Sequence, residues 1–202
     1  MHKTFLTFTT GVVLAACGGE TTTSPSSDTI AAPMRSIHKT EIASPPDPCV
    51  VLTANRAQSE LGVADLANVT PAPENKQSGA GSAPWSCAYS SGGARIALIA
   101  DWSAISSAMG SAAVADAYGN GAGGAYEAIS SVGVANIMAN DDSGSHVVLW
   151  SALAPQGDQS RELIVRATIA DPGRSASERA EIATALAEIY LMSAQQKAAE
   201  RK

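Results

Sequence analysis

The sequence predicts an α+β protein in which an antiparallel sheet of about five strands is covered by helices. Short apolar stretches separated by turn residues predict strands that are joined by tight hairpins and therefore pair antiparallel. Three other stretches carry apolar residues at helical spacing, and such helices have to bury that face against the sheet. The chain has 202 residues, which is enough for one domain with a core and some additional length.

The first predicted element of the domain is a helix at residues 54–61. Thr53 before it is a good N-terminal cap, because its hydroxyl can accept a hydrogen bond from a free backbone amide. Gly62 after it suits the left-handed conformation in which many helices end. Local signals therefore bound this helix on both sides.

A pair of strands is predicted after this helix. Trp85, Cys87 and Tyr89 alternate with small or polar residues and fall on one face of a first strand. The glycines at 92–93 predict a hairpin turn, and residues 96–101 form a second strand with apolar groups on both faces. We expect this second strand to lie in the centre of the sheet.

A helix and three further strands are predicted in the middle of the domain. Alanine-rich spacing indicates a helix within residues 103–118, with Ser103 as its cap. Apolar stretches separated by NDDSGS and PQGDQS, which are turn sequences, predict strands at 132–139, 147–153 and 163–169. Strands joined in this way pair antiparallel.

The last helix is the most strongly marked element. Ser175 is followed three residues later by Glu178, the capping-box pattern in which each side chain bonds the other residue's backbone amide. Ile182, Leu186 and Tyr190 then fall on one face of the helix. The predicted order is helix, two strands, helix, three strands, helix.

The chain begins like an exported protein. His2 and Lys3 precede about a dozen apolar or small residues, a run that is too short to span a bilayer and is typical of a secretory signal. The run ends in the sequence LAAC, in which Cys17 is the cysteine. This ending resembles the bacterial lipobox, and the resemblance implies cleavage before Cys17 and attachment of lipid to its sulfur.

The lipobox resemblance makes residues 1–16 a lipoprotein signal peptide and Cys17 a membrane anchor that carries acyl chains such as palmitate. Two or three acyl chains hold a protein on a membrane almost permanently, at about 0.8 kcal/mol per buried methylene. Gly18 stands where Asp is associated with inner-membrane retention, which implies the outer membrane in a host with two membranes. Residues 17–46, rich in Thr, Ser, Pro and Ala, are predicted to be a flexible tether, and residues 47–198 a single globular domain. The alternative is a plain secreted protein with this cysteine near the cleavage site by chance.

The two other cysteines, Cys49 and Cys87, both fall in the domain. In an oxidising compartment an even pair indicates a disulfide. The bridge would close a loop of about 38 residues and contribute roughly 4 kcal/mol in the chain-entropy model. A thiol nucleophile and a metal pair are the alternatives, but there is no CxxC motif and His146 is the one histidine of the predicted domain.

Three stretches of the domain carry a family resemblance. DPCVVLTANRAQSELG at 47–62, WSCAY at 85–89 and AISSVGVANIM at 128–138 are similar to motifs of bacterial lipoproteins of unknown function with a PsbP-like or LpqN-like sandwich domain. Arg56 stands where that class usually has an acidic residue. The resemblance implies a PsbP-like α/β sandwich without established enzymatic activity, so it supplies no catalytic residues.

Motifs for other chemistry are sparse. Asp141 and Asp142 lack the ligand spacing of a calcium loop and predict a solvated hairpin turn. The glycines of GNGAGG at 119–124 lack the Lys-Ser/Thr of a phosphate-binding loop. The net charge of −6 argues against nucleic acid, whose binding needs clustered Lys and Arg. We expect no cofactor, no metal and no nucleic-acid partner.

These observations favour a non-enzymatic binding module for an envelope protein, anchored in the cell envelope and facing the periplasm or the exterior. The first alternative is a carrier of a small apolar ligand, in which Trp102 or Trp150 would border a pocket between sheet and helices. Tryptophans are also needed in the core, because no Phe follows the signal peptide. The second alternative is an envelope hydrolase with His146, expected at the surface, as its base.

Overall fold

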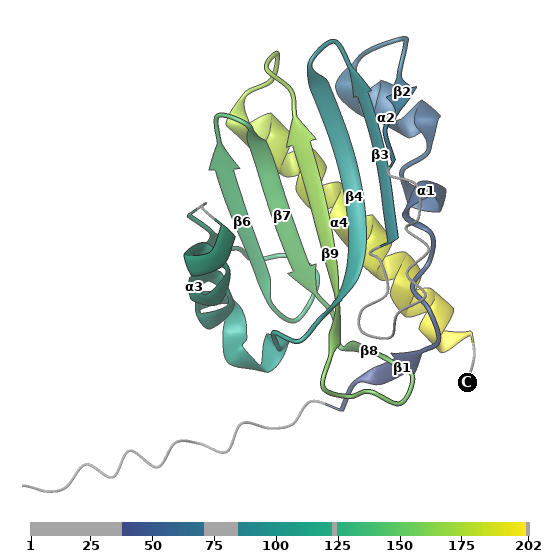
Figure 1. Cartoon of the computed structure of the whole chain (residues 1–202), viewed down its shortest axis with the longest axis vertical. Helices are drawn as coiled ribbons and strands as arrows, with labels where there is room; N and C mark the ends of the chain where they lie inside the picture. Colours follow the sequence, from purple (N-terminus) through teal and green to yellow (C-terminus); the bar gives the residue numbers. More distant parts are fainter. Residues whose placement is uncertain (1–37, 71–84, 123–124, 201–202) are drawn as a thin grey trace, which may run out of the picture. The chain divides into compact units, whose positions relative to one another are not determined.

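The computed structural model describes residues 38–70, 85–122 and 125–200 (Figure 1). The helices are α1 (Pro48–Val51), α2 (Ala54–Leu61), α3 (Gly110–Ala122) and α4 (Ala176–Ala199), and a short 3-10 helix, η1 (Ser107–Met109), precedes α3. The strands are β1 (Thr40–Ile42), β2 (Ala67–Asn68), β3 (Trp85–Ser91), β4 (Ala94–Ser103), β5 (Glu127–Ala128), β6 (Asn136–Asp141), β7 (Gly144–Trp150), β8 (Leu153–Pro155) and β9 (Glu162–Ala170). The predicted signal peptide, Cys17 and most of the predicted tether lie outside the described residues.

The main sheet is antiparallel and has seven strands in the order β2-β3-β4-β9-β7-β6-β5. The predicted α+β class with an antiparallel sheet is therefore confirmed. The predicted number of about five strands is too small, because two-residue strands extend the sheet at both edges. The five long strands are those predicted from the sequence, and β4 lies between β3 and β9, inside the sheet as expected. A separate parallel pair joins β1 to β8.

One face of the sheet is covered by α4, which lies behind β9, β7 and β4 in Figure 1. Alternate residues of the long strands point toward this helix and form the main core, because side chains on a strand alternate between faces. Leu186, Tyr190 and Leu191 of α4 are fully buried there. Burial of each such side chain contributes about 1.5–3 kcal/mol, so this interface stabilises the fold substantially.

The opposite face is covered only in part. Val114 and Ala115 of α3 pack on Ile137, Trp150 and Ile164 in a second, smaller core. In Figure 1 α3 lies beside β6, at the edge of the sheet. No described helix lies over the rest of this face on β3, β4 and β9.

The helix boundaries confirm several local signals. The hydroxyl of Thr53 accepts a hydrogen bond from the amide of Arg56 at the start of α2, and Gly62 ends that helix in the left-handed conformation at φ 66°. Ser175 and Glu178 form the reciprocal bonds of a capping box at the start of α4. The start and end of α2 and the start of α4 therefore lie where the capping residues of the sequence predict them.

The domain begins earlier than predicted. Residues 40–42, assigned above to the tether, form β1 and pair with β8. Lys39 is buried, and Tyr190 donates a hydrogen bond to the carbonyl oxygen of Pro46. The predicted boundary at residue 47 is therefore wrong, because strand pairing and buried contacts far along the chain compensate for a segment with little apolar surface. At the other end, α4 continues to Ala199.

The helix predicted behind Ser103 also begins later. Ser103 is the last residue of β4, Ser106 caps η1, and α3 starts at Gly110. Tertiary contacts hold the intervening segment out of a helix: the indole of Trp150 donates to the carbonyl of Ile105, at 2.8 Å between heavy atoms. The capping role predicted for Ser103 is therefore wrong.

The strand predicted at 132–139 starts only at Asn136. Gly133 has a φ of +123°, which is not a strand conformation. The amide of Val134 instead donates to the carbonyl oxygen of Trp150. The segment before β6 is thus a turn that packs closely against β7.

Candidate functional site

The part of the sheet that no described helix covers is the candidate functional surface, and we call it the open sheet face. Strand register defines it, because residues directly opposite on paired strands point to the same side. Thr168 of β9 lies opposite Ala97 of β4 and His146 of β7, and Arg166 of β9 lies opposite Ile99 of β4. With their alternate neighbours, its residues are Ser86, Ala88, Ser90, Arg95, Ala97, Ile99, Asp101, His146, Arg166, Thr168 and Ala170.

Arg166 is the central charged residue of the open sheet face. Its Nη2 lies 3.7 Å from Oδ2 of Asp101, and its side chain keeps 36% of its surface exposed. The Nε atom is shielded from solvent and has no hydrogen-bond partner. Burial of an N–H group without an acceptor costs about 1–3 kcal/mol, so other contacts of this side chain have to offset that cost.

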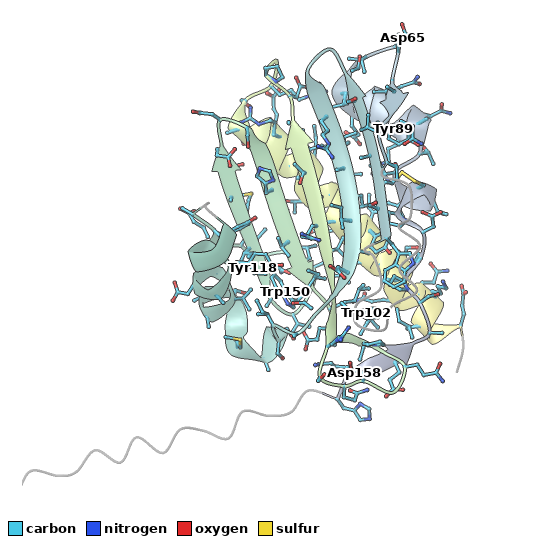
Figure 2. The ribbon with its side chains drawn as sticks, in the orientation of Figure 1. Asp65, Tyr89, Trp102, Tyr118, Trp150 and Asp158 are labelled. Carbon is cyan, nitrogen blue, oxygen red and sulfur yellow. A yellow bond between two sulfur atoms is a disulfide. The ribbon has the colours of Figure 1, made fainter. Side chains whose placement is uncertain are left out.

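Two tyrosines border the face on the side of α3. The rings of Tyr118 and Tyr126 meet edge to face with centroids 5.7 Å apart, and Tyr118 packs in the same way on Trp150 at 5.4 Å. Figure 2 shows Tyr118 above Trp150 beside α3. Burial raises the pKa of both tyrosines, and the positive charge of Arg166 partly opposes that rise. Both hydroxyls are therefore neutral at physiological pH and can donate hydrogen bonds.

His146 lies at the other side of the open sheet face. Its Nδ1 is 3.3 Å from the hydroxyl oxygen of Thr168, and its Nε2 is 3.7 Å from Oδ2 of Asp141. Of the two adjacent aspartates, Asp141 is the one that lies beside His146. The ring is half-buried, not a freely exposed surface group. The arrangement brings an imidazole, a hydroxyl and a carboxylate together.

The loop between β6 and β7 is a hairpin turn, as predicted from Asp141 and Asp142. The carboxylate of Asp141 accepts hydrogen bonds from the amide and hydroxyl of Ser143 and from the amide of Gly144. These bonds lower the pKa of the Asp141 carboxyl. No group of three potential metal ligands occurs among the residues that the structure describes.

The two tryptophans named as possible pocket residues, Trp102 and Trp150, lie on opposite faces of the sheet. Trp102 is opposite Leu163, on the α4 side, and packs edge to face on Trp85 with centroids 6.3 Å apart. Trp150 is opposite Ile164, on the α3 side, and is fully buried. The structure therefore does not bring this pair together.

Two shallow cavities lie elsewhere. One of about 370 Å³ runs between α4 and the β5–β6 edge, with Met138, Ala180 and Thr184 in its lining. The other, of about 260 Å³, lies between β1, β8 and the end of α4. Neither is lined by a tryptophan.

Cys49 and Cys87 are paired, with their sulfur atoms 2.07 Å apart. The predicted disulfide is confirmed: it joins α1 to β3, and Cys87 is fully buried in the main core. Cys17 lies outside the described residues. Among the described helices, none has the length and hydropathy needed to span a bilayer.

The residues that sequence reasoning missed are Arg166, Asp101, Tyr118 and Tyr126. One signal was present, because Arg166 and Thr168 interrupt an otherwise apolar strand at alternate positions and so mark one face as polar. The tyrosines gave no such signal, since their place depends on where α3 packs. Comparison of the chain with protein-family models, curated proteins and solved structures gives no match.

Proposed function

We propose that this protein is an exported lipoprotein, anchored to a membrane through Cys17, whose domain is a non-enzymatic binding module for another envelope protein. The open sheet face is the binding surface. The anchor is supported by the order of basic residues, apolar run and LAAC motif at the start of the chain.

The observation that carries the binding role is the make-up of the open sheet face. The small residues Ala88 and Ala97 are buried, and the accessible side chains include Arg95, Arg166 at the centre of the face and the tyrosine pair at its border. Arg and Tyr are enriched at the energetic centres of protein interfaces, because they combine apolar area with directed hydrogen bonds. A second protein can pack on the accessible part of this face and form hydrogen bonds with its arginines and tyrosines.

The finer family assignment is part of the same proposal. The two motifs that carry the cysteines, DPCVVLTANRAQSELG and WSCAY, are joined by the Cys49–Cys87 bridge. The bridge brings together the two cysteine motifs on which the resemblance to the PsbP-like sandwich of bacterial lipoproteins rests. That class has no established enzymatic activity, which agrees with a binding role.

A hydrolase is less well supported by the geometry around His146. Thr168, the hydroxyl beside it, sits in the middle of β9, and β9 is paired on both sides, with β4 and β7. Its neighbouring backbone amides are therefore used in the sheet and are not free to stabilise an oxyanion. The apolar-ligand alternative is also less well supported, because neither of the two cavities described above is lined by Trp102 or Trp150.

Site-specific photocrosslinking of the full-length, membrane-anchored protein tests the binding role. A photoreactive phenylalanine analogue replaces Arg95 or Thr168 on the open sheet face, and Met192 on the exposed side of α4 as the control position. We expect the same discrete protein adduct from both face positions and none from the control. Adducts that are equal at all three positions, or absent from both face positions, would contradict the proposal.

A further inference from the structure

The charged end of Arg166 is held by fewer contacts than the charged ends of Arg174 and Arg179. Arg174 bonds the carboxylate of Asp171 at 3.0 Å and the carbonyl of Glu60, and Arg179 donates to three backbone carbonyls. No hydrogen bond joins Arg166 to any described residue, although a guanidinium has five N–H donors. Its fork is therefore free to bind a further acceptor.

The stem of Arg166 is fixed while its head is accessible. Ile99 and Val148 are its direct cross-strand neighbours, and they hold the aliphatic part between β4 and β7. Nε is shielded from solvent, so the exposed part of the side chain is the outer end of the guanidinium. An arginine held in this way loses little conformational freedom when it binds a ligand.

The charges around Arg166 limit what it can hold. Asp101 lies 3.7 Å away, beyond hydrogen-bond distance. The further charged or titratable groups of this face are Arg95 and His146, and Asp141 lies beside the histidine. The Arg166–Asp101 pair has no net charge, so a ligand would be held by the N–H donors of the guanidinium, and the aspartate repels a doubly charged phosphate more strongly than a singly charged carboxylate. The planar fork matches a carboxylate, to which it can donate two parallel hydrogen bonds.

The tyrosine pair adds an apolar wall to this position. Tyr118 and Tyr126 are close enough to Arg166 for its charge to lower their pKa against the larger effect of burial. Their rings can pack on a hydrocarbon group while their neutral hydroxyls donate hydrogen bonds. The expected ligand is thus a carboxylate borne on an apolar or aliphatic stem.

We propose that Arg166 is a carboxylate-binding site, flanked by Tyr118 and Tyr126, and that the partner protein supplies an Asp or Glu side chain to it. This inference rests on the proposed function, in which the open sheet face binds another envelope protein. It adds the chemistry of the central contact: an acidic residue of the partner lies over Arg166, and its aliphatic carbons pack on the tyrosine rings.

The site can be tested without the partner, by NMR titration of the full chain with sodium phenylacetate. Phenylacetamide, which has the same shape without the charge, is the matched control ligand, and inorganic phosphate is the second. We expect phenylacetate to shift the backbone resonances of Arg166, Ile99 and Val148 with a Kd on the order of 1–10 mM, as befits one exposed charge pair with a small apolar contact. Phenylacetamide and phosphate should each bind at least about tenfold more weakly, a difference of about 1.4 kcal/mol.

Two variants connect this binding to the residue. Arg166→Gln should raise the Kd for phenylacetate about tenfold or more, whereas Arg95→Gln, which removes an arginine from the same face, should change it less than about twofold. Equal binding of phenylacetate and phenylacetamide to the wild-type chain overturns the proposal, and this comparison needs no variant to fold. Equal effects of the two substitutions overturn it as well.

Failure of this site is distinguishable from failure of the proposed function. Discrete crosslinks from Arg95 and Thr168 without preferential phenylacetate binding would keep the partner-binding role and remove the carboxylate site. Preferential phenylacetate binding without those crosslinks would keep the site and remove the envelope protein as its occupant.

Discussion

The ammonium group of Lys39 lies 3.2 Å from Oε1 of Glu162, and both side chains are buried, with 8% and 1% of their surfaces exposed. The lysine also donates to the carbonyl oxygen of Gln159, and the other oxygen of Glu162 accepts from the amide of Ser107. This ion pair therefore joins the start of the domain, the first residue of β9 and the 3-10 helix before α3. It explains why residues before the predicted domain boundary belong to the fold.

Removal of one member of this pair should be costly. Lys39→Met leaves the Glu162 carboxylate buried without its counterion, so we expect the free energy of unfolding to fall by about 3 kcal/mol at neutral pH. Urea denaturation measures the change. Arg161→Ala, which breaks the exposed pair with Asp158, is the control and should cost less than about 1 kcal/mol. Equal losses of stability for the two variants would show that the buried ion pair contributes no more than an exposed one.

The disulfide should contribute strongly to stability, because it closes a separation of 38 residues in the unfolded chain. In the chain-entropy model this corresponds to roughly 4 kcal/mol. The double replacement Cys49→Ala and Cys87→Ala should lower the midpoint of denaturation accordingly, and added reductant should lower that of the wild-type chain but not that of the variant. An unchanged denaturation midpoint in the double variant, and in the wild-type chain with reductant, would contradict this role of the disulfide.

Gly133 should tolerate no side chain. A Cβ there would lie 2.6 Å from the carbonyl oxygen of Trp150 and 3.3 Å from Leu191, at a φ of +123°. We expect Gly133→Ala to destabilise the protein by about 3 kcal/mol or more, since both backbone strain and a clash with a fixed strand oppose it. Gly157, at φ +78° with nothing near its Cβ position, is the control, and Gly157→Ala should cost only about 1 kcal/mol. Similar losses of stability for the two variants would show that backbone strain alone, without a clash, opposes a side chain at Gly133.

The turn capped by Asp141 should make stability depend on pH. The Ser143 hydroxyl is the main cause of its lowered pKa, and the amides of Ser143 and Gly144 and the nearby His146 act in the same direction. A carboxyl whose pKa is lower in the folded than in the unfolded chain stabilises the fold above its unfolded pKa, and this stabilisation is lost as the pH falls through the folded value. Asp141→Ala should therefore lower the free energy of unfolding by about 0.5–1 kcal/mol at pH 7, a modest amount because the carboxylate is exposed. The loss should be smaller below about pH 4. Denaturation of both proteins at pH 7 and pH 3 measures this, with Asp142→Ala as the control; a cost that is the same at both pH values would contradict the role of the charge.

The elements with local signals could be predicted from the sequence. Thr53 and Gly62 bound α2, Gly92 and Gly93 set the first hairpin, and the capping box starts α4, because caps and turns depend on neighbouring residues only. The Cys49–Cys87 pairing followed from counting cysteines. Such features do not require knowledge of the distant parts of the chain.

The features that depend on distant contacts could not be predicted. β1 is stabilised by β8 and by Glu162, more than a hundred residues away, and β2 and β5 have only two residues each. The same limit applies to the site. Whether Trp102 and Trp150 share a face depends on the register of β4, β9 and β7, and the sequence alone does not fix that register.

The most direct single measurement is the intact mass of the full-length protein purified from the membranes of its host, without reductant. Export as a lipoprotein predicts a chain that begins at Cys17, carries the added mass of a diacylglycerol and an amide-linked acyl chain, and lacks two hydrogens because of the Cys49–Cys87 bridge. A Cys17→Ser variant should lack the lipid mass and leave the membrane fraction. A wild-type chain of unprocessed mass, or one cut elsewhere without added lipid, would contradict the proposed anchor and with it the placement of the open sheet face in the envelope.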